Sequence, residues 1–463
     1  MRRRPPVRTR SIIAMSLLLS ATAITAARVS AADRDARDVV DGLPNADVCA
    51  KLGFPRDRAE DDAYAPRRKA AGGTFRSAAP TLSMEAAPPP SPAPAAPIIA
   101  GGVVAADQAG ELPYDTERYP DATSNPIRQV GEEPVSTFSI DVDTASYANV
   151  RRFLKDGRLP PRDAVRVEEL INYFDYGYAP PTDPDTPFAI HTTVVPSPWA
   201  EGKEIIHIGL QGYDLASDDR PPLNLVFLMD VSGSMNDPDK LPLVQKALNV
   251  LIDELRPEDH VSIAVYAGAA GAVLEPTDGT RKLKIRCAVD AMRAGGSTAG
   301  GEGLALAYRM AEQSYQKDSV TRVILMTDGD FNVGIADPEK LEDFVAEKRK
   351  TGVYLSVYGF GRGNYNDVMM QTLSQAGNGT AAYIDTLQEA KKLFRDDFSG
   401  SLFPIADDVK IQVEFNPDRV AEYRLIGSET RMLNREDFNN DQVDAGEVGA
   451  GASVTALYEI TPV

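Results

Sequence analysis

The sequence contains few of the residues on which many small folds and enzymes depend. Among 463 residues it has two cysteines, three histidines and one tryptophan. Two cysteines cannot build a disulfide-rich scaffold. The histidines, His191, His207 and His260, lie far apart in the sequence, so zinc binding and histidine-based catalysis have no cluster to rest on. The composition therefore argues against a disulfide-held miniprotein and against a zinc or histidine-dependent enzyme.

Positive charge is also scarce. The chain carries 49 lysines and arginines against 68 aspartates and glutamates, which gives a formal net charge of −19. Nucleic acid and anionic lipid surfaces would repel such a protein, so we expect neither as a partner. An acidic surface suits a soluble protein and is compatible with divalent cations.

Long apolar runs are rare, and the one present lies near the start of the chain. Residues 11–27 are rich in Ile, Leu and Ala, they follow a segment with five arginines, and small residues stand at positions 29–31. This order is typical of a secretory signal peptide. We expect residues 1–31 to be a signal peptide and the mature chain to begin near Ala32, with an uncleaved membrane anchor as the alternative. No cysteine follows the run, so no lipid anchor is expected at this position.

Residues 32–112 are predicted to be a disordered tether. They mix charges and then become a Pro/Ala run at 87–97, which favours extended polyproline conformation. We interpret this run as a spacer, with a Pro-rich recognition motif as the alternative. Cys49 falls in this segment, whereas Cys287 falls in an expected helix, where a small buried thiol is predicted. A disulfide between the two is the alternative.

Strands and helices are predicted to alternate between residues 221 and 400. The run at 223–229 is apolar throughout, as in a strand buried on both faces. Such alternation indicates a doubly wound, mostly parallel α/β sheet, as in Rossmann-like domains. The expected strands are 223–229, 261–266, 322–326, 353–360 and 381–384, and the expected helices are 241–255, 282–292, 302–315, 338–350, 366–375 and 387–398.

The segments on either side of this domain are predicted to be richer in strands. Residues 113–220 show strand patterns at 137–144, 188–195 and 204–211, with short helices at 146–155 and 167–174. Residues 401–463 show strands at 409–415, 423–426 and 453–460, and this segment is expected to be incomplete. Since neither flank has enough strands for a sheet, we expect both to form one β-rich domain. The ends of the inserted α/β domain would then lie close together.

Oxygen-bearing side chains follow two of the predicted α/β strands. Asp230, Ser232 and Ser234 come directly after the strand at 223–229, and Asp328 follows the strand at 322–326. Thr298 lies in a Gly-containing loop that enters a helix. In an open α/β sheet, ligands bind at the carboxyl ends of the strands. Carboxylates and hydroxyls are ligands for hard cations, so we expect Mg²⁺ here, with Mn²⁺ or Ca²⁺ as alternatives.

This set of residues resembles the metal-ion-dependent adhesion site of von Willebrand factor type A (VWA) domains. That site consists of D-x-S-x-S, a distant Thr and a distant Asp, and Asp230, Ser232, Ser234, Thr298 and Asp328 fill these positions. The resemblance implies a VWA domain at 221–400, which holds a divalent cation and binds a partner protein through an acidic side chain. Segments at 129–147, 166–174, 423–431 and 454–460 are similar to the flanking domains of exported YfbK-like VWA proteins.

Two other motifs compete with this interpretation. Asp141 and Asp143 follow a predicted strand, as the nucleophile pair of haloacid-dehalogenase-type phosphatases does, but the helices and strands after them do not continue that fold. Asp437, Asn439 and Asp441 resemble a calcium loop, but Gln442 stands where the turn needs Gly. A polar turn is expected there.

The function expected from the sequence is metal-dependent binding of a partner protein at the cell envelope, in the periplasm or at the cell surface. We expect no enzymatic activity. The alternatives are a structural envelope scaffold whose metal stabilises the fold and a metal-dependent phosphatase.

Overall fold

The computed structural model describes residues 45–55, 116–121, 123–140, 143–183, 186–216, 219–267, 269–295, 300–329, 338–440, 443 and 445–463. The expected signal peptide and most of the expected tether lie outside these residues. Within the part described, no helix is both long and apolar enough to cross a membrane.

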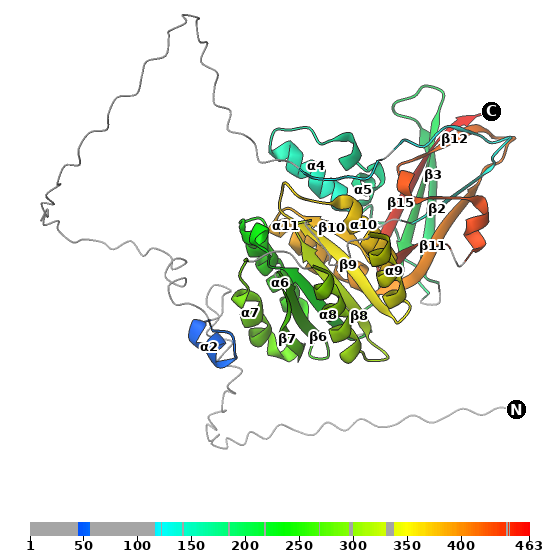
Figure 1. Ribbon diagram of the computed structural model, residues 1–463. Helices are drawn as coiled ribbons and strands as arrows, with labels where there is room; N and C mark the ends of the chain where they lie inside the picture. Colours follow the sequence, from blue (N-terminus) through cyan, green and yellow to red (C-terminus); the bar gives the residue numbers. More distant parts are fainter. Residues whose placement is uncertain are drawn as a thin grey trace, which may run out of the picture.

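A six-stranded sheet forms the centre of the α/β domain, in the order β10-β9-β8-β5-β6-β7. All neighbouring strands are parallel except β6 and β7, which pair antiparallel. The mostly parallel Rossmann-like sheet expected from the sequence is therefore confirmed (Figure 1). The strands are β5 (Leu223–Asp230), β6 (His260–Tyr266), β7 (Ala270–Asp278), β8 (Val320–Thr327), β9 (Val353–Phe360) and β10 (Ala381–Ile384).

Helices cover both faces of this sheet. Alternate residues of β5 point to opposite faces: Phe227 packs in the core under α6 and α7, and Leu228 in the core under α8, α9 and α10. The unbroken apolar sequence of β5 follows from this double burial. The helices are α6 (Leu241–Glu254), α7 (Lys282–Ala291), α8 (Gly300–Gln313), α9 (Pro338–Arg349), α10 (Asp367–Ala376), α11 (Leu387–Lys391) and α12 (Phe398–Leu402).

The last part of this domain differs from the sequence prediction. The single helix expected at 387–398 is divided into α11, a π-helical turn at Lys392–Asp396, and α12. The edge strand β7 was not expected, because Gly271 and Pro276 obscure its strand pattern. Pro is tolerated there since the strand lies at the edge of the sheet.

Two antiparallel sheets form the β-rich domain. One has the order β1-β12-β15-β4-β3 and the other β13-β2-β11-β14. Strand β4 pairs with β15 along its length, so strands from both flanks lie in one sheet, as a single β-rich domain requires. The strands are β1 (Arg128–Gln129), β2 (Val135–Ser139), β3 (Phe188–Pro196), β4 (Glu204–Gly212), β11 (Pro404–Glu414), β12 (Val420–Ile426), β13 (Met432–Leu433), β14 (Gly446–Gly449) and β15 (Ser453–Pro462).

The two antiparallel sheets share one core. Phe138 of β2 and Tyr458 of β15 meet edge to face, and Phe415 stacks on Tyr423 at a centroid distance of 4.2 Å. Strand β11 belongs to the second sheet, where it pairs with β2 and β14. Strands β1, β13 and β14 are too short to have been detected by alternation.

Two short helices, α4 (Ala145–Lys155) and α5 (Val167–Asn172), join the domains. Figure 1 shows them over one end of the α/β domain, and α4 packs beside β10. The guanidinium of Arg166, buried at the start of α5, forms ion pairs with Glu169 and with Asp367 of α10. Short 3₁₀ helices lie at Arg162–Ala164, Gly233–Asn236, Gly279–Arg281, Glu429–Arg431 and Arg435–Asn439.

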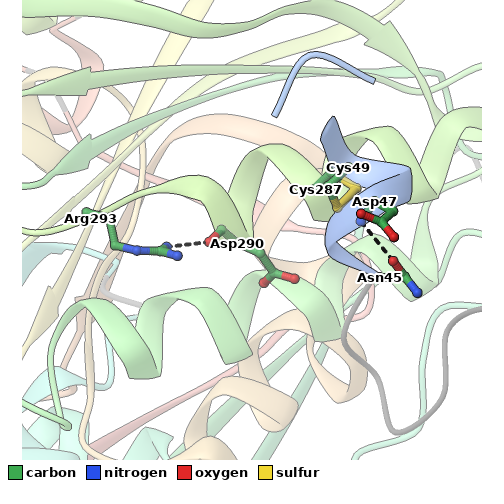
Figure 2. The surroundings of a disulfide bond; sticks show 6 residues. All are labelled: Asn45, Asp47, Cys49, Cys287, Asp290 and Arg293. Carbon is green, nitrogen blue, oxygen red and sulfur yellow. Dashed lines mark hydrogen bonds between the residues drawn. A yellow bond between two sulfur atoms is a disulfide. The ribbon is translucent and has the colours of Figure 1, made fainter. Parts of the chain in front are cut away.

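Cys287 lies buried in a helix as expected, but the preferred prediction of a free thiol is wrong and the alternative, a disulfide with Cys49, is what the structure shows. Cys49 lies in helix α2 (Ala46–Lys51) within the range expected to be disordered, and it forms a disulfide with Cys287 of α7 (Figure 2). The side chain of Asn45 caps α2 by accepting a hydrogen bond from the backbone N–H of Asp47. Phe54 then packs against the core of the α/β domain. Helix α2 has six residues, too few to show a periodic apolar pattern in the sequence.

Candidate metal centre

The centre of the site is the turn after β5. This strand lies between β6 and β8, and its last residue, Asp230, is fully buried. One carboxylate oxygen of Asp230 accepts a hydrogen bond from the backbone N–H of Ser232 at 2.8 Å. The hydroxyls of Ser232 and Ser234 lie 2.9 Å apart. The D-x-S-x-S segment thus places three side chains around one point.

Asp328 approaches from the neighbouring strand. It directly follows β8 and is fully buried. Gly329, the next residue, has φ +111, and a Cβ atom there would lie 2.3 Å from the carbonyl oxygen of Asn364. Only glycine fits this position, so the loop can turn sharply and leave Asp328 at the sheet edge.

Four of the five residues predicted from the sequence lie at this edge of the sheet, and the fifth, Thr298, lies outside the described residues. The loop that leads to it is nevertheless held at the site. The backbone N–H of Gly295 donates to the carbonyl oxygen of Val231 at 2.7 Å.

Besides Thr327, whose hydroxyl donates to Asp230 at 3.3 Å, three further residues surround the carboxylates. The hydroxyl of Tyr266 donates to Asp230 at 3.1 Å. The ammonium of Lys240 donates to Asp328 at 2.9 Å and to the side-chain oxygen of Asn364 at 3.2 Å. Sequence reasoning missed all three. Tyr266 ends β6 at the same sheet edge, so the rule on strand ends would have found it, but no spacing pattern points to Lys240 or Asn364.

Burial and charge act differently on the two carboxyl groups. Burial, together with the negative charge of Asp328, raises the pKa of Asp230 to about 6. Burial also tends to raise the pKa of Asp328, but the hydrogen bond and positive charge of Lys240 outweigh it, and the pKa of Asp328 is lowered. Two carboxylates in a low-dielectric setting make a cation favourable there.

The donor set fits a small divalent cation. In an octahedral shell with metal–oxygen distances of about 2.0–2.1 Å, neighbouring ligand oxygens lie about 2.9 Å apart. The hydroxyls of Ser232 and Ser234 have this separation. Ser234 is exposed whereas Asp230 is buried, so the site is anionic at its base and open to solvent at its rim. No group of three His, Cys, Asp or Glu side chains suited to a metal occurs among the described residues.

The competing motifs do not form sites in the part of the chain that the structure describes. Asp143 is buried and accepts hydrogen bonds from the backbone N–H of Ala381 and from Arg431, so it joins the two domains. Asp437 caps a 3₁₀ helix together with Asn434. Asp141 and Asp441 lie outside the described residues.

Comparisons with known proteins agree with this architecture. The family profile described as "von Willebrand factor type A domain" matches residues 224–396. The profile described as "von Willebrand factor" matches residues 113–207, and "Uncharacterized protein YfbK, C-terminal" matches residues 400–463.

Individual relatives and solved structures are similar to parts of the chain. YfbK of Escherichia coli (strain K12) is 47% identical over 352 residues, which is 75% of this chain and 61% of that protein. The chain thus spans less than two thirds of that relative. Human inter-alpha-trypsin inhibitor heavy chain H3 is 25% identical over 258 residues, 52% of this chain and 28% of that protein. Among solved structures, a von Willebrand factor type A protein from Catenulispora acidiphila is 18% identical, with a TM-score of 0.38, covering 62% of this chain and 66% of that one.

VWA domains generally mediate protein–protein interactions, and they commonly hold a divalent cation at a metal-ion-dependent adhesion site. The α/β sheet with the D-x-S-x-S turn at its edge, the matching flanks and the identity to YfbK lead to one conclusion. The chain contains a von Willebrand factor type A domain and the C-terminal domain described for YfbK, and it is similar to YfbK over 75% of its length.

Proposed function

We propose that this protein binds a partner protein through a divalent cation, most favourably Mg²⁺, held by Asp230, Ser232, Ser234, Thr298 and Asp328. The observation that carries this proposal is the combination of a buried anionic base with an exposed hydroxyl at the rim. The cation is held from below, and an acidic side chain of the partner approaches it from solvent. When bound, the ion supplies Lewis acidity toward that carboxylate.

The chemistry of the donors supports recognition of an acidic group. The hydroxyls of Ser232, Ser234 and Thr298 are neutral, so they leave most of the charge of the cation uncompensated. Two carboxylates cannot fill a six-coordinate shell, and water completes it until a partner arrives. A carboxylate that replaces water gains a charge-assisted contact.

Metal binding is tested by removing one carboxylate at a time. In calorimetric titrations with Mg²⁺, we expect Asp230→Ala and Asp328→Ala each to abolish binding while the circular dichroism spectrum stays close to wild type. Asp343→Ala, which removes an exposed carboxylate on α9, serves as the control and keeps full affinity. Unchanged affinity in both site variants would refute the assignment.

Partner binding is tested by pull-down from an envelope extract with and without chelator. We expect the captured protein to be lost with chelator and with Thr298→Ala, since the hydroxyl of Thr298 ties the second loop to the metal. A partner whose affinity is the same under both conditions would favour the alternative of a scaffold with a fold-stabilising metal.

We further propose that the protein is exported, with residues 1–31 removed as a signal peptide, and works in the periplasm or at the cell surface. The disulfide between Cys49 and Cys287 supports this, because disulfides persist in oxidising compartments. Cleavage near Ala32 keeps Cys49 in the mature chain. Mass spectrometry of the protein from its native envelope should find an N-terminus near Ala32, and a full-length chain in the cytoplasm would contradict the proposal.

A further inference from the structure

Lys240 is unusual among the lysines of this chain because its ammonium lies inside the metal centre. Its side chain is 6% exposed, and its Nζ donates to Asp328 and Asn364. Burying an ammonium is costly unless it is paired. A lysine that served only to begin helix α6 would extend into solvent, so its burial indicates a role at the site.

The surroundings of Lys240 hold its side chain in this place. Gly361 has φ +75, and a Cβ atom there would lie 2.3 Å from Cγ of Lys240, so the aliphatic stem runs directly over the glycine backbone. At its end, Asn364 accepts the second hydrogen bond from the ammonium. Both residues belong to the loop between β9 and α10, which therefore forms one wall of a slot for this lysine.

The charge of Lys240 changes what the metal centre needs to become neutral. Asp230, Asp328 and Lys240 together carry −1 when all three are ionised. A divalent cation brings this total to +1, and one carboxylate from a partner brings it to zero. Without Lys240 the cation alone would neutralise the two aspartates, and an added carboxylate would leave an excess negative charge. Such differences matter because the group is buried and poorly screened.

We propose that Lys240 is a specificity-determining residue that couples metal binding to binding of an acidic ligand. Its positive charge weakens the bare cation complex and strengthens the complex that includes a carboxylate. The metal centre then holds its ion firmly only when an acidic partner is present. This inference rests on the proposed function and deepens it, since it names the residue that makes the two ligands cooperate.

The test is a calorimetric titration of Mg²⁺ into the full chain in sodium chloride and in sodium acetate at equal ionic strength, with acetate as the carboxylate probe. We expect wild-type protein to bind Mg²⁺ several-fold more tightly in acetate. Lys240→Met, which keeps the length of the side chain and removes its charge, should bind Mg²⁺ about tenfold more tightly than wild type in chloride. It should also lose the effect of acetate.

Two further variants make the result specific. Lys240→Gln keeps a hydrogen-bond donor without the charge, so it should shift the affinity in the same direction even if Lys240→Met folds poorly. Lys246→Met removes an exposed positive charge from the same helix, and it should behave as wild type.

Three outcomes count against the inference. If wild type binds Mg²⁺ and neither Lys240→Met nor Lys240→Gln binds it more tightly, Lys240 is only a structural support for Asp328 and this inference alone fails. It also fails if acetate strengthens binding equally in all variants. If neither wild type nor any variant binds Mg²⁺, the proposed function fails with it.

Discussion

At the residue scale, the carboxylate of Asp230 in the candidate metal centre is held by hydrogen bonds on both of its oxygens. One of its carboxylate oxygens accepts a hydrogen bond from the backbone of Ser232, and the other accepts hydrogen bonds from Tyr266 and Thr327. These contacts fix the orientation of the carboxylate before any ligand arrives, so little freedom is lost on binding. Groups that orient metal ligands in this way influence affinity without contacting the metal themselves.

A first prediction concerns Tyr266. In Tyr266→Phe the carboxylate of Asp230 loses a buried donor, and we expect the affinity for Mg²⁺ to fall by roughly tenfold or more. The control is Tyr308→Phe on α8, because the hydroxyl of Tyr308 is buried with no hydrogen-bond partner among the described residues. Calorimetric titration of both variants with Mg²⁺ separates the loss of the hydrogen bond to Asp230 from the general effect of removing a buried tyrosine hydroxyl. Equal affinity in Tyr266→Phe and wild type would show that this hydrogen bond does not support the site.

A second prediction concerns Arg166, which is paired with Glu169 and Asp367 where α5 meets α10. Arg166→Met leaves two buried carboxylates without their guanidinium, so we expect the free energy of unfolding to fall by about 3–5 kcal/mol. Lys350→Met removes one side of an exposed ion pair with Glu347 and should leave the free energy of unfolding close to that of wild type. Urea unfolding measures the free energy of unfolding of both variants. Similar midpoints for the two variants would contradict the prediction.

Among the elements of the fold, the loop between β9 and α10 links the metal centre to the flanking segment. Its Asn364 accepts a hydrogen bond from Lys240, and the backbone N–H of Gly363 donates to Glu117 of the flanking segment. Glu117 is in turn held by the guanidinium of Arg152 on α4 at 2.8 Å. A continuous set of contacts therefore joins α4 to the wall of the site.

A third prediction compares two glycines of this loop. Gly361 and Gly363 both have positive φ, but a Cβ atom at Gly363 meets open space whereas one at Gly361 meets Lys240. A non-glycine residue in this conformation costs about 1–2 kcal/mol. We expect Gly363→Ala to lose about that much stability and Gly361→Ala to lose clearly more, and only Gly361→Ala should alter the affinity for Mg²⁺. Equal losses in urea unfolding, with equal metal affinity, would show that Lys240 adapts freely.

At the scale of the whole molecule, the disulfide between Cys49 and Cys287 fastens helix α2 to helix α7 of the α/β domain (Figure 2). The two cysteines are 238 residues apart in sequence, and both are fully buried. The bond therefore closes a long loop that includes the flanking segment 116–216 and the first part of the α/β domain. Such a loop restricts the unfolded chain strongly.

A fourth prediction follows for the double variant Cys49→Ser, Cys287→Ser. Its free energy of unfolding should be about 2–4 kcal/mol lower than that of oxidised wild type. Wild type treated with reductant should show the same loss, whereas reductant should leave the double variant unchanged. A double variant as stable as oxidised wild type would show that the disulfide does not stabilise the folded state.

The sequence alone determined the type of domain and most of the predicted site. A strand that is buried on both faces is apolar at every position, and such a run can be recognised in the sequence without knowledge of the neighbouring strands. The strand that carries Asp230 was therefore predicted almost to its last residue. Asp230, Ser232 and Ser234 lie within five residues of one another, so their spacing can be recognised from the sequence alone. Asp328 was found because parallel strands end at a common edge.

Only the tertiary structure decided which distant residues meet. Lys240 lies 88 residues from Asp328, and nothing in its own surroundings in the sequence distinguishes it from an exposed lysine at the start of a helix. The pairing of Cys49 with Cys287 was likewise not the preferred prediction. The short helix α2 is held by its packing and disulfide to α7, and its own sequence shows no helical periodicity. Long-range pairing depends on the geometry of the whole sheet and its connections, and a linear pattern does not contain that geometry.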